Sequence, residues 1–197
     1  MSKTRVVVLA SGTGSLFQAL ADQQDALNIE IVALIVDKDV PAVAKAQARN
    51  ISVIEVPMLP DRAQWDGVMN EVLSRQSPDL VISAGFMKIL GPQTVGAFRG
   101  RLINTHPALL PNFPGAHAVR DALAAGVNET GCSVHFVDEG VDTGPVIASR
   151  TVAISSDDTE ETLHERIKVQ ERELLIETVQ KIVDGKIHYE NGKVVTR

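Results

Sequence analysis

The start of the chain constrains its fold most, because a fully apolar run there leads directly into a glycine-containing turn. The run Val6–Ala10 is followed by SGTGS and then by a segment with helical spacing. A strand without polar alternation is typical of a parallel sheet that is covered on both faces. The same succession of strand and helix recurs until the apolar run that ends at His106. We therefore predict an α/β fold with a mostly parallel central sheet and helices on both faces.

The pattern changes after Gly115. Two predicted strands, Thr130–Val137 and Gly144–Ile154, are separated by a connection too short for a helical crossover, which predicts an antiparallel pair. A long helix is predicted from about Thr159 to Asp184. Asn191-Gly192 between two β-prone arms then predicts a hairpin. Because no repeat, low-complexity segment or linker interrupts the chain, one domain over residues 1–197 is the simplest interpretation.

Bulk properties exclude several classes of function. The net charge of −6 argues against a broad basic surface for nucleic acid or an anionic membrane. No apolar run is long enough for a signal sequence or a membrane span. With Cys132 as the single cysteine, no intrachain disulfide can form and a cysteine-based metal site is not expected. We expect a cytoplasmic protein without a bound metal.

The SGTGS turn is a candidate phosphate site. Glycines between a strand and a helix let backbone N–H groups approach an anion at the positive end of the helix. We expect Ser15 to cap this helix and to donate to a phosphate oxygen. The turn lacks the lysine of a Walker loop, and Phe17 stands where a dinucleotide fingerprint has its third glycine. This favours a single phosphate over a dinucleotide, although a tight turn without a ligand is an open alternative.

Two polar residues, Asn104 and His106, stand at the end of an apolar strand, before a loop with three prolines. They share parity, so their side chains point to the same side, at the sheet edge where α/β proteins bind ligands. Asp142, in the loop 138–145, reaches them if that loop folds over the edge. A carboxylate stabilises an imidazolium and an amide can donate to an oxyanion. The alternatives are a structural histidine, a turn-forming asparagine and a solvated loop.

The stretch INTHPALLPNFPGAHAVRDAL resembles the signature of folate-dependent formyltransferases, with the Asn-x-His-Pro-x-Leu-Leu-Pro core at Asn104–Pro111. The similarity extends in order and spacing through VVVLASGTGSLFQAL, AGFMKIL, GCSVHFVDEGVDTGPVI and IKVQERELL. It is strongest to the branch that acts on glycinamide ribonucleotide in purine synthesis. The resemblance implies a single-domain formyltransferase fold with a Rossmann-like sheet and an antiparallel C-terminal part.

The resemblance also implies a reaction. The amino group of glycinamide ribonucleotide would take the formyl group of the cosubstrate 10-formyltetrahydrofolate, giving N-formylglycinamide ribonucleotide and tetrahydrofolate. Asn104 would stabilise the oxyanion, His106 would act as general acid and base, and Asp142 would hold His106 and favour its protonated form. The partners would be these small molecules, with no nucleic acid or membrane, and the protein would be a monomer or homodimer.

Binding roles carry over by position. The resemblance implies a half at about residues 1–100 for the ribonucleotide phosphate and a half at about 101–197 for catalysis and folate. Leu16 stands where the family often has Asn, which puts one phosphate contact in doubt. The ribonucleotide side comprises Gly12, Thr13, Gly14, Ser15, Leu16, Lys168 and Glu171. The folate side comprises Arg62, Met87, Lys88, Ile89, Leu90, Asn104, Asp138, Glu139, Gly140, Val141 and Asp142.

Three rival interpretations stay open. A formyltetrahydrofolate deformylase uses the same trio with water, but would bring an N-terminal regulatory domain, whereas this chain begins at its first strand. A methionyl-tRNA formyltransferase would continue the core with an Arg-Gly segment and add a C-terminal RNA-binding domain. A catalytically dead nucleotide sensor is a third class, against which the intact trio argues.

The remaining notable residues receive structural interpretations. Cys132 and Trp65 are predicted to pack in the core. His164 and His188 are predicted to be solvated, and His135 to be structural. A direct ligand role for His117 is left open.

Overall fold

The structure, a computed structural model, describes residues 2–197. Its elements in chain order are β1 (Thr4–Ala10), α1 (Ser15–Asp22), β2 (Ile29–Val36), α2 (Pro41–Gln47), β3 (Val53–Glu55), α3 (Arg62–Gln76), β4 (Leu80–Ser83), α4 (Pro92–Ala97), β5 (Leu102–His106), α5 (Ala118–Ala124), β6 (Glu129–Phe136), β7 (Val146–Ala153), α6 (Glu160–Val183), β8 (Ile187–Glu190) and β9 (Lys193–Thr196).

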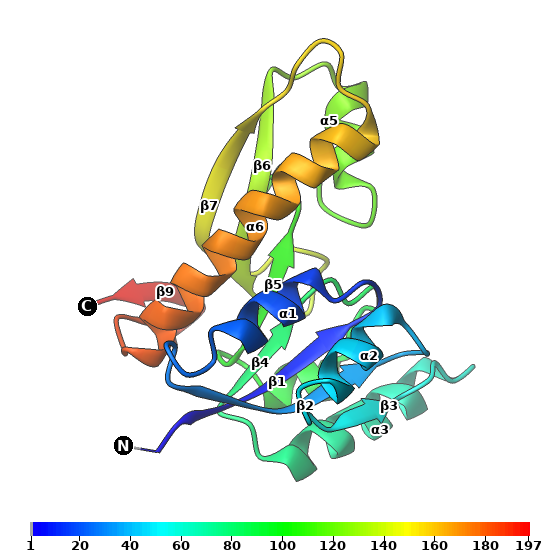
Figure 1. The fold of residues 1–197 in the computed structure, drawn as a ribbon, viewed down its shortest axis with the longest axis vertical. Helices are drawn as coiled ribbons and strands as arrows, with labels where there is room; N and C mark the ends of the chain where they lie inside the picture. The colour runs from blue at the N-terminus through cyan, green and yellow to red at the C-terminus, as the bar shows by residue number, and fades with distance from the viewer. Residues whose placement is uncertain (1) are drawn as a thin grey trace.

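Seven strands form one sheet in the order β3-β2-β1-β4-β5-β6-β7 (Figure 1). Pairing is parallel from β3 to β5, and β6 runs antiparallel to both β5 and β7. The predicted α/β class, with a mostly parallel sheet and an antiparallel later part, is confirmed. The antiparallel pairing of β6 with β7 follows from their short connection, since a parallel pair needs a long crossover.

Strand β1 shows why the sheet is covered on both faces. Val6 and Val8 pack in one apolar cluster with residues of α1, α2 and α6, while Val7 and Leu9 pack in a second cluster with α3 and α4. All four side chains are fully buried. Because successive strand residues point to opposite faces, a strand in the middle of a three-layer fold must be apolar throughout.

The strand order reverses at β1, which pairs with β2 on one side and with β4 on the other. Such a switch point leaves a crevice at the carboxyl ends of the strands, because the two connections leave in opposite directions. Here the turn after β1, the segment after β4 and the end of β5 meet at one edge. The register places Asn104 of β5 beside Ser83 of β4 and opposite His135 of β6.

The C-terminal strands β8 and β9 form a separate two-stranded sheet. Its turn residues Asn191 and Gly192 have φ angles of 49° and 81°, as a tight hairpin turn requires, and the predicted hairpin is confirmed. The ring of Tyr189 meets Phe136 edge to face at 5.4 Å, which ties the hairpin to β6. Across residues 2–197, no helix is both long enough and apolar enough to cross a membrane.

Candidate active site

A cavity of about 580 Å³ lies at this edge of the sheet. Its wall comes from the turn after β1, the segment after β4, the end of β5, the loop between β6 and β7, and one face of α6. The charged or titratable lining residues are Lys88, His106, His135, Asp138, Asp142, His164, Lys168 and Glu171. The cavity has the size of a small-molecule site, and it brings together segments from both halves of the sequence.

The turn after β1 presents the start of α1 to the cavity, whose lining includes residues 11–16. Gly14 has φ 70°, and a Cβ there would lie 2.6 Å from the Cβ of Ala42, so this position requires glycine. A Cβ on Gly12 would meet nothing within 4 Å, so the space beside it is open to a ligand. The first backbone N–H groups of a helix have no partner within the helix and suit an anion.

One detail of this turn corrects our expectation. Ser15 was expected to cap α1, but the N-cap residue is Gly14, and no side chain caps the helix. Ser15 is already the first helical residue, because the left-handed conformation of Gly14 starts the helix one residue earlier. Leu16, the next residue, is buried, and its side chain has no hydrogen-bond donor. It can therefore offer an anion only its backbone N–H.

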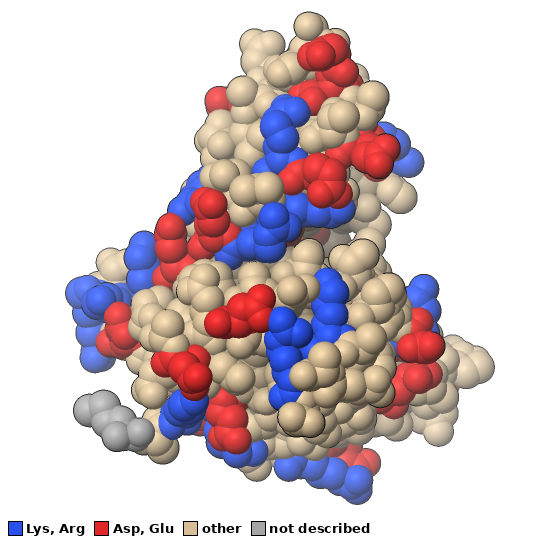
Figure 2. Space-filling view, in the orientation of Figure 1, with Lys and Arg blue, Asp and Glu red and all other residues tan. Residues whose placement is uncertain are grey.

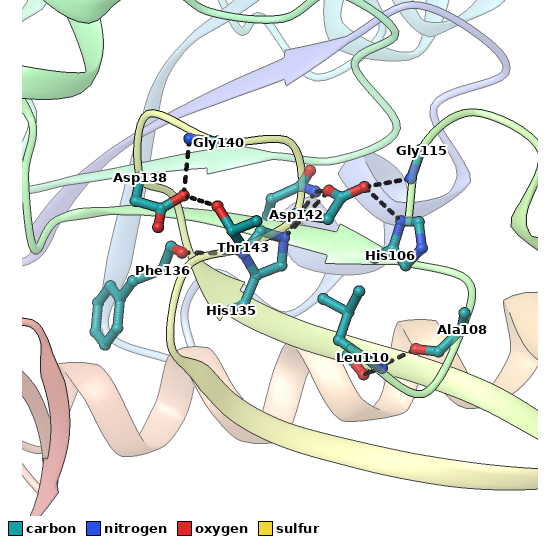
Figure 3. Close-up of polar contacts among 12 residues, drawn as sticks. His106, Ala108, Leu110, Gly115, His135, Phe136, Asp138, Gly140, Asp142 and Thr143 are labelled. Atoms are coloured by element: carbon teal, nitrogen blue, oxygen red, sulfur yellow. Dashed lines mark hydrogen bonds and ion pairs between the residues drawn. The ribbon is translucent and has the colours of Figure 1, made fainter. Parts of the chain in front are cut away.

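Asn104, His106 and Asp142 meet in the cavity wall, as their spacing and the resemblance suggested. The Asn104 amide Nδ2 lies 3.4 Å from Asp142 Oδ1, and His106 Nδ1 lies 3.3 Å from Asp142 Oδ2. Gly115 donates its backbone N–H to Asp142 Oδ2 at 2.8 Å (Figure 3). The proline-containing loop thus holds the carboxylate that faces His106. Asp142 has φ 54°, a conformation that its tertiary contacts must stabilise.

Both ring nitrogens of His106 face oxygen atoms. Nδ1 faces the Asp142 carboxylate, and Nε2 lies 2.7 Å from the backbone carbonyl oxygen of Phe113. Neither oxygen can donate, so a neutral imidazole, with one N–H, satisfies only one of them. The imidazolium form satisfies both. With 4% of its surface exposed, His106 is shielded from bulk water, which strengthens its interaction with the carboxylate.

His135 also belongs to this cluster, although the sequence indicated a structural role. Its Nε2 lies 3.1 Å from Asn104 Nδ2 and 3.5 Å from Asp142 Oδ1, and its Nδ1 lies 2.9 Å from the Phe136 carbonyl oxygen. That carbonyl can only accept, so Nδ1 is the donor, and in the neutral ring Nε2 accepts from Asn104. His135 therefore fixes which way the Asn104 amide points. A polar residue inside the apolar strand TGCSVHFV was the available signal.

The surroundings of Asp142 favour its charged form. Burial alone would raise its pKa, but the adjacent His135 ring, the Gly115 N–H and the nearby His106 together lower it to about 2. The side chain is 13% exposed and remains a carboxylate at neutral pH. The Asp142 carboxylate is therefore a fixed negative charge beside two imidazole rings.

The face of α6 toward the cavity carries His164, Lys168 and Glu171. Glu171 is 6% exposed, and burial raises its pKa. Within residues 2–197 no Lys, Arg or His lies within ion-pairing distance of its carboxylate. Lys168 pairs with Glu165 at 2.7 Å. His164, predicted to be solvated, is partly exposed and lines the cavity.

The segment after β4 supplies Met87, Lys88, Ile89 and Leu90 to the cavity, as the resemblance implied. Met87 and Ile89 are 64% and 59% exposed, so the wall presents apolar side chains that a flat aromatic ligand can cover. Arg62 does not line the cavity. Its guanidinium donates to the Ile89 carbonyl oxygen and stacks over the ring of Trp65, which places it directly behind this wall.

The loop between β6 and β7 forms the facing wall. Asp138, Gly140, Val141 and Asp142 line the cavity. Glu139 does not, because its side chain is exposed and pairs with Arg99 at 3.0 Å. The structure therefore gives no support to a contact between the Glu139 side chain and a ligand in the cavity.

The other singled-out residues do not line the cavity. His117 is exposed at the start of α5 and does not line the cavity, although the preceding residue Ala116 does. Cys132 is fully buried, and burial, followed by the nearby Glu171, raises its pKa to about 12, which makes it a poor nucleophile. Trp65 is fully buried, as predicted. His188 is partly exposed, with its Nε2 3.9 Å from Glu190 Oε2.

Residues 2–197 contain no group of three or more His, Cys, Asp or Glu side chains arranged to hold a metal ion.

Surface charge near the site is mixed. On the face drawn in Figure 2, Lys and Arg side chains alternate with Asp and Glu along α6 instead of forming one basic field. Two ion pairs that join Arg150 of β7 to this helix, with Glu173 and with Glu177, account for part of the pattern. Any attraction of an anion therefore depends on the local groups in the cavity.

Comparison with known families and proteins agrees with this geometry. The family described as formyl transferase matches residues 4–179. A phosphoribosylglycinamide formyltransferase of Mycobacterium tuberculosis is 51% identical over 178 residues, which cover 89% of this chain and 83% of that protein. The trifunctional purine biosynthetic protein adenosine-3 of Bos taurus is 41% identical over 198 residues, 98% of this chain but 20% of that protein.

Solved structures show the same fold. Glycinamide ribonucleotide transformylase 1 from Symbiobacterium toebii superposes with a TM-score of 0.94 at 33% identity, covering 99% of this chain and 94% of that one. A formyltetrahydrofolate deformylase from Pseudomonas syringae superposes with a TM-score of 0.92 at 26% identity, covering 98% of this chain and 66% of that one. The family match over residues 4–179 includes the turn after β1, the Asn104–His106–Asp142 cluster and most of α6.

Proposed function

The chain belongs to the formyl transferase family, and we propose that it transfers the formyl group of 10-formyltetrahydrofolate to the amino group of glycinamide ribonucleotide in purine biosynthesis. The observation that carries the proposal is the single cavity in which an anion-binding turn, the unpaired carboxylate of Glu171 and the Asn104–His106–Asp142 cluster meet. Such a site suits a substrate with a phosphate at one end and an amine at the other.

The reaction needs few groups. The amine nitrogen attacks the formyl carbon, the new C–N bond forms, and the bond from that carbon to N10 of the folate breaks. The amine loses a proton and N10 gains one. Asn104 turns one N–H of its amide from its present acceptors to the formyl oxygen as negative charge develops there. His106, held by Asp142 through Nδ1, turns its Nε2–H from the Phe113 carbonyl oxygen to the same formyl oxygen and moves the proton, with water completing the relay.

The two ends of the ribonucleotide are bound separately. Gly12, Thr13, Gly14, Ser15 and Leu16 hold the phosphate through backbone N–H groups, with Lys168 adding a positive charge. The buried carboxylate of Glu171 receives the amino group, because an unpaired buried carboxylate is stabilised by a hydrogen-bond donor of opposite charge. This leaves the amine next to the cluster that carries the chemistry.

The folate lies between the two facing walls. Met87, Lys88, Ile89 and Leu90 form one side, and the backbone of 138–142 holds the pterin on the other. Arg62 lies outside the cavity lining with its guanidinium on the Ile89 carbonyl oxygen, so it would meet the glutamate tail only where that tail extends past the first wall. We propose one catalytic domain with small-molecule partners and without nucleic acid or membrane, acting in the cytoplasm as a monomer or homodimer. Within this domain, the half at about residues 1–100 binds the ribonucleotide phosphate, and the half at about 101–197 carries out catalysis and binds the folate.

A spectrophotometric assay tests the function. We expect the folate product to form from 10-formyltetrahydrofolate only when glycinamide ribonucleotide is present, with one N-formyl product for each folate released. Consumption of the formyl-folate at the same rate without the amine would identify a hydrolase, the activity named for the Pseudomonas syringae relative. Absence of turnover under both conditions would contradict the proposal.

A further inference from the structure

The cavity leaves one imidazole without a partner. Lys88 pairs with Asp37 at 3.4 Å, and His106 and His135 both face Asp142. Lys168 pairs with Glu165. By contrast, His164 makes no ion pair or side-chain hydrogen bond with any residue in the range 2–197. It is half-buried and lines the cavity, so an available donor faces the space that a ligand would fill.

The position of His164 on α6 places its imidazole on the face of the helix that lines the cavity. Residues 164, 168 and 171 follow the spacing that aligns side chains along one face of a helix, and all three line the cavity. Helix α6 packs against α1, the helix whose first turn presents the phosphate-binding backbone. Glu171 is the most buried of the three, and the cavity that it lines also contains Asn104, His106 and Asp142. His164 lies one turn before Lys168 on the same face of α6 and lines the same cavity as the 11–16 turn.

We propose that His164 is a second charged ligand of the ribonucleotide phosphate, which donates an N–H to it beside Lys168 and takes up a proton as the substrate binds. The inference rests on the proposed function and extends it, since the resemblance assigned no role to this residue. A phosphate carries nearly two negative charges at neutral pH, and the 11–16 turn contributes no charged side chain to balance them.

The electrostatics of the cavity fit proton uptake. Burial, and then the charge of Lys168, lower the pKa of His164, while Glu165 and Glu160 act in the opposite direction. Charged groups on the neighbouring elements are engaged elsewhere: Arg120 of α5 pairs with Asp121, and Arg150 of β7 pairs with glutamates of α6. A phosphate dianion in the cavity would reverse the effect of Lys168 and favour the imidazolium.

Calorimetric titration of the full chain with glycinamide ribonucleotide, in buffers of different ionisation enthalpy at pH 7.5, measures the protons bound. We expect the wild type to take up more than half a proton per site, in excess of any change in the substrate itself. His164→Asn should abolish this excess and raise the Kd for the ribonucleotide about tenfold, the scale of a lost charge-assisted hydrogen bond. The Kd for a folate analogue should be unchanged.

His164→Lys separates binding from folding effects, because a permanent cation should restore the affinity without restoring the proton uptake. Its affinity should also fall less than that of the wild type as the pH rises, because only the wild type loses a positive charge there. His188→Asn, a histidine replacement on β8 outside the cavity, serves as the matched control and should match the wild type throughout.

Unchanged ribonucleotide affinity and proton uptake in His164→Asn would overturn the inference. Equal losses for ribonucleotide and folate would also overturn it, since they indicate a general change in the cavity. Failure of the proposed function is distinguishable: the wild-type chain would then not transfer the formyl group at all, whereas failure of this inference leaves formyl transfer intact.

Discussion

The two walls of the cavity are held in different ways. One wall is the segment 85–91 after β4, and the other is the segment 137–144 between β6 and β7. The first is fixed from behind. Ser11 accepts the backbone N–H of Met87 through its hydroxyl at 2.9 Å, and Asp37, whose side chain is 3% exposed, pairs with Lys88. These anchors keep the wall in place without contributing to the proposed chemistry.

Asp66 is the strongest of these anchors. This carboxylate is 2% exposed and accepts the backbone N–H groups of Gly91, Gln93 and Thr94, as well as the Thr94 hydroxyl at 2.5 Å. It therefore joins α3 to the start of α4, one residue beyond the cavity lining, and a Cβ on Gly91 would lie 2.4 Å from the carboxylate.

The second wall is held partly by its own contacts and partly by the site. Asp138 accepts from the Gly140 N–H at 3.1 Å and from the Thr143 hydroxyl at 2.7 Å. The connection to the rest of the site runs through Asp142, whose carboxylate faces Asn104, both histidines and the Gly115 N–H. In the first wall, the residues that stabilise the segment are therefore different from the residues proposed to carry the chemistry. In the second wall, Asp142 has both roles.

The largest effect is expected in the second wall. Asp142→Ala or His106→Ala should lower turnover by about 10²-fold or more, the scale of lost proton transfer and charge stabilisation. Steady-state kinetics with both substrates measures it. Asp142→Asn, which keeps the size and one acceptor, should also lose turnover, and this variant controls for displacement of the loop. Near-wild-type turnover in all three variants would exclude the proposed mechanism.

The matching change in the first wall should affect stability instead. Asp66→Ala leaves three backbone donors without their acceptor and should lower the free energy of unfolding by about 3 kcal/mol. Denaturant unfolding measures it, and the fraction that remains folded should keep most of its turnover. Thr94→Val, which removes one of these bonds, should cost about 1 kcal/mol. A large loss of turnover in fully folded Asp66→Ala would contradict the expectation that this anchor affects only stability.

Acid should weaken the second wall. The pKa of Asp142 is lowered from 3.8 to about 2, so the stability that its ionised form contributes is fully present above about pH 4 and is lost as the pH falls toward 2. The shift corresponds to at most about 2 kcal/mol. Unfolding free energies of the wild type and Asp142→Asn, measured between pH 5 and 2, should converge as the pH falls. A constant difference would show that ionisation of this group is not what stabilises the loop.

The smallest effect concerns the pair behind the first wall. Lys88→Met leaves Asp37 buried without its cation and should raise the KM for formyl-folate about threefold, with turnover at saturation little changed. A double-mutant cycle with Asp37→Asn should give a coupling free energy of about 1 kcal/mol. Additive effects would indicate that the two side chains do not act as a pair.

Most of the fold was predictable because it follows from local patterns. Continuous apolar runs indicated buried parallel strands, and the short connection before Val146 indicated the antiparallel pair. The parity of Asn104 and His106 correctly placed both side chains on one side of β5. The cap of α1 was predicted wrongly, since nothing in SGTGS shows that Gly14 takes φ 70° against Ala42.

The sequence by itself determined the strands, the helices and the sheet edge at which the polar residues gather, because alternation and periodicity are properties of neighbouring residues. Only the tertiary structure decided which of those residues touch. Asn104 meets His135 through the register of β5 with β6, and Asp142 reaches His106 because its loop folds back over the edge. His164 faces the cavity because α6 crosses the sheet at that place. Contacts between distant segments depend on register and packing, which no local pattern encodes.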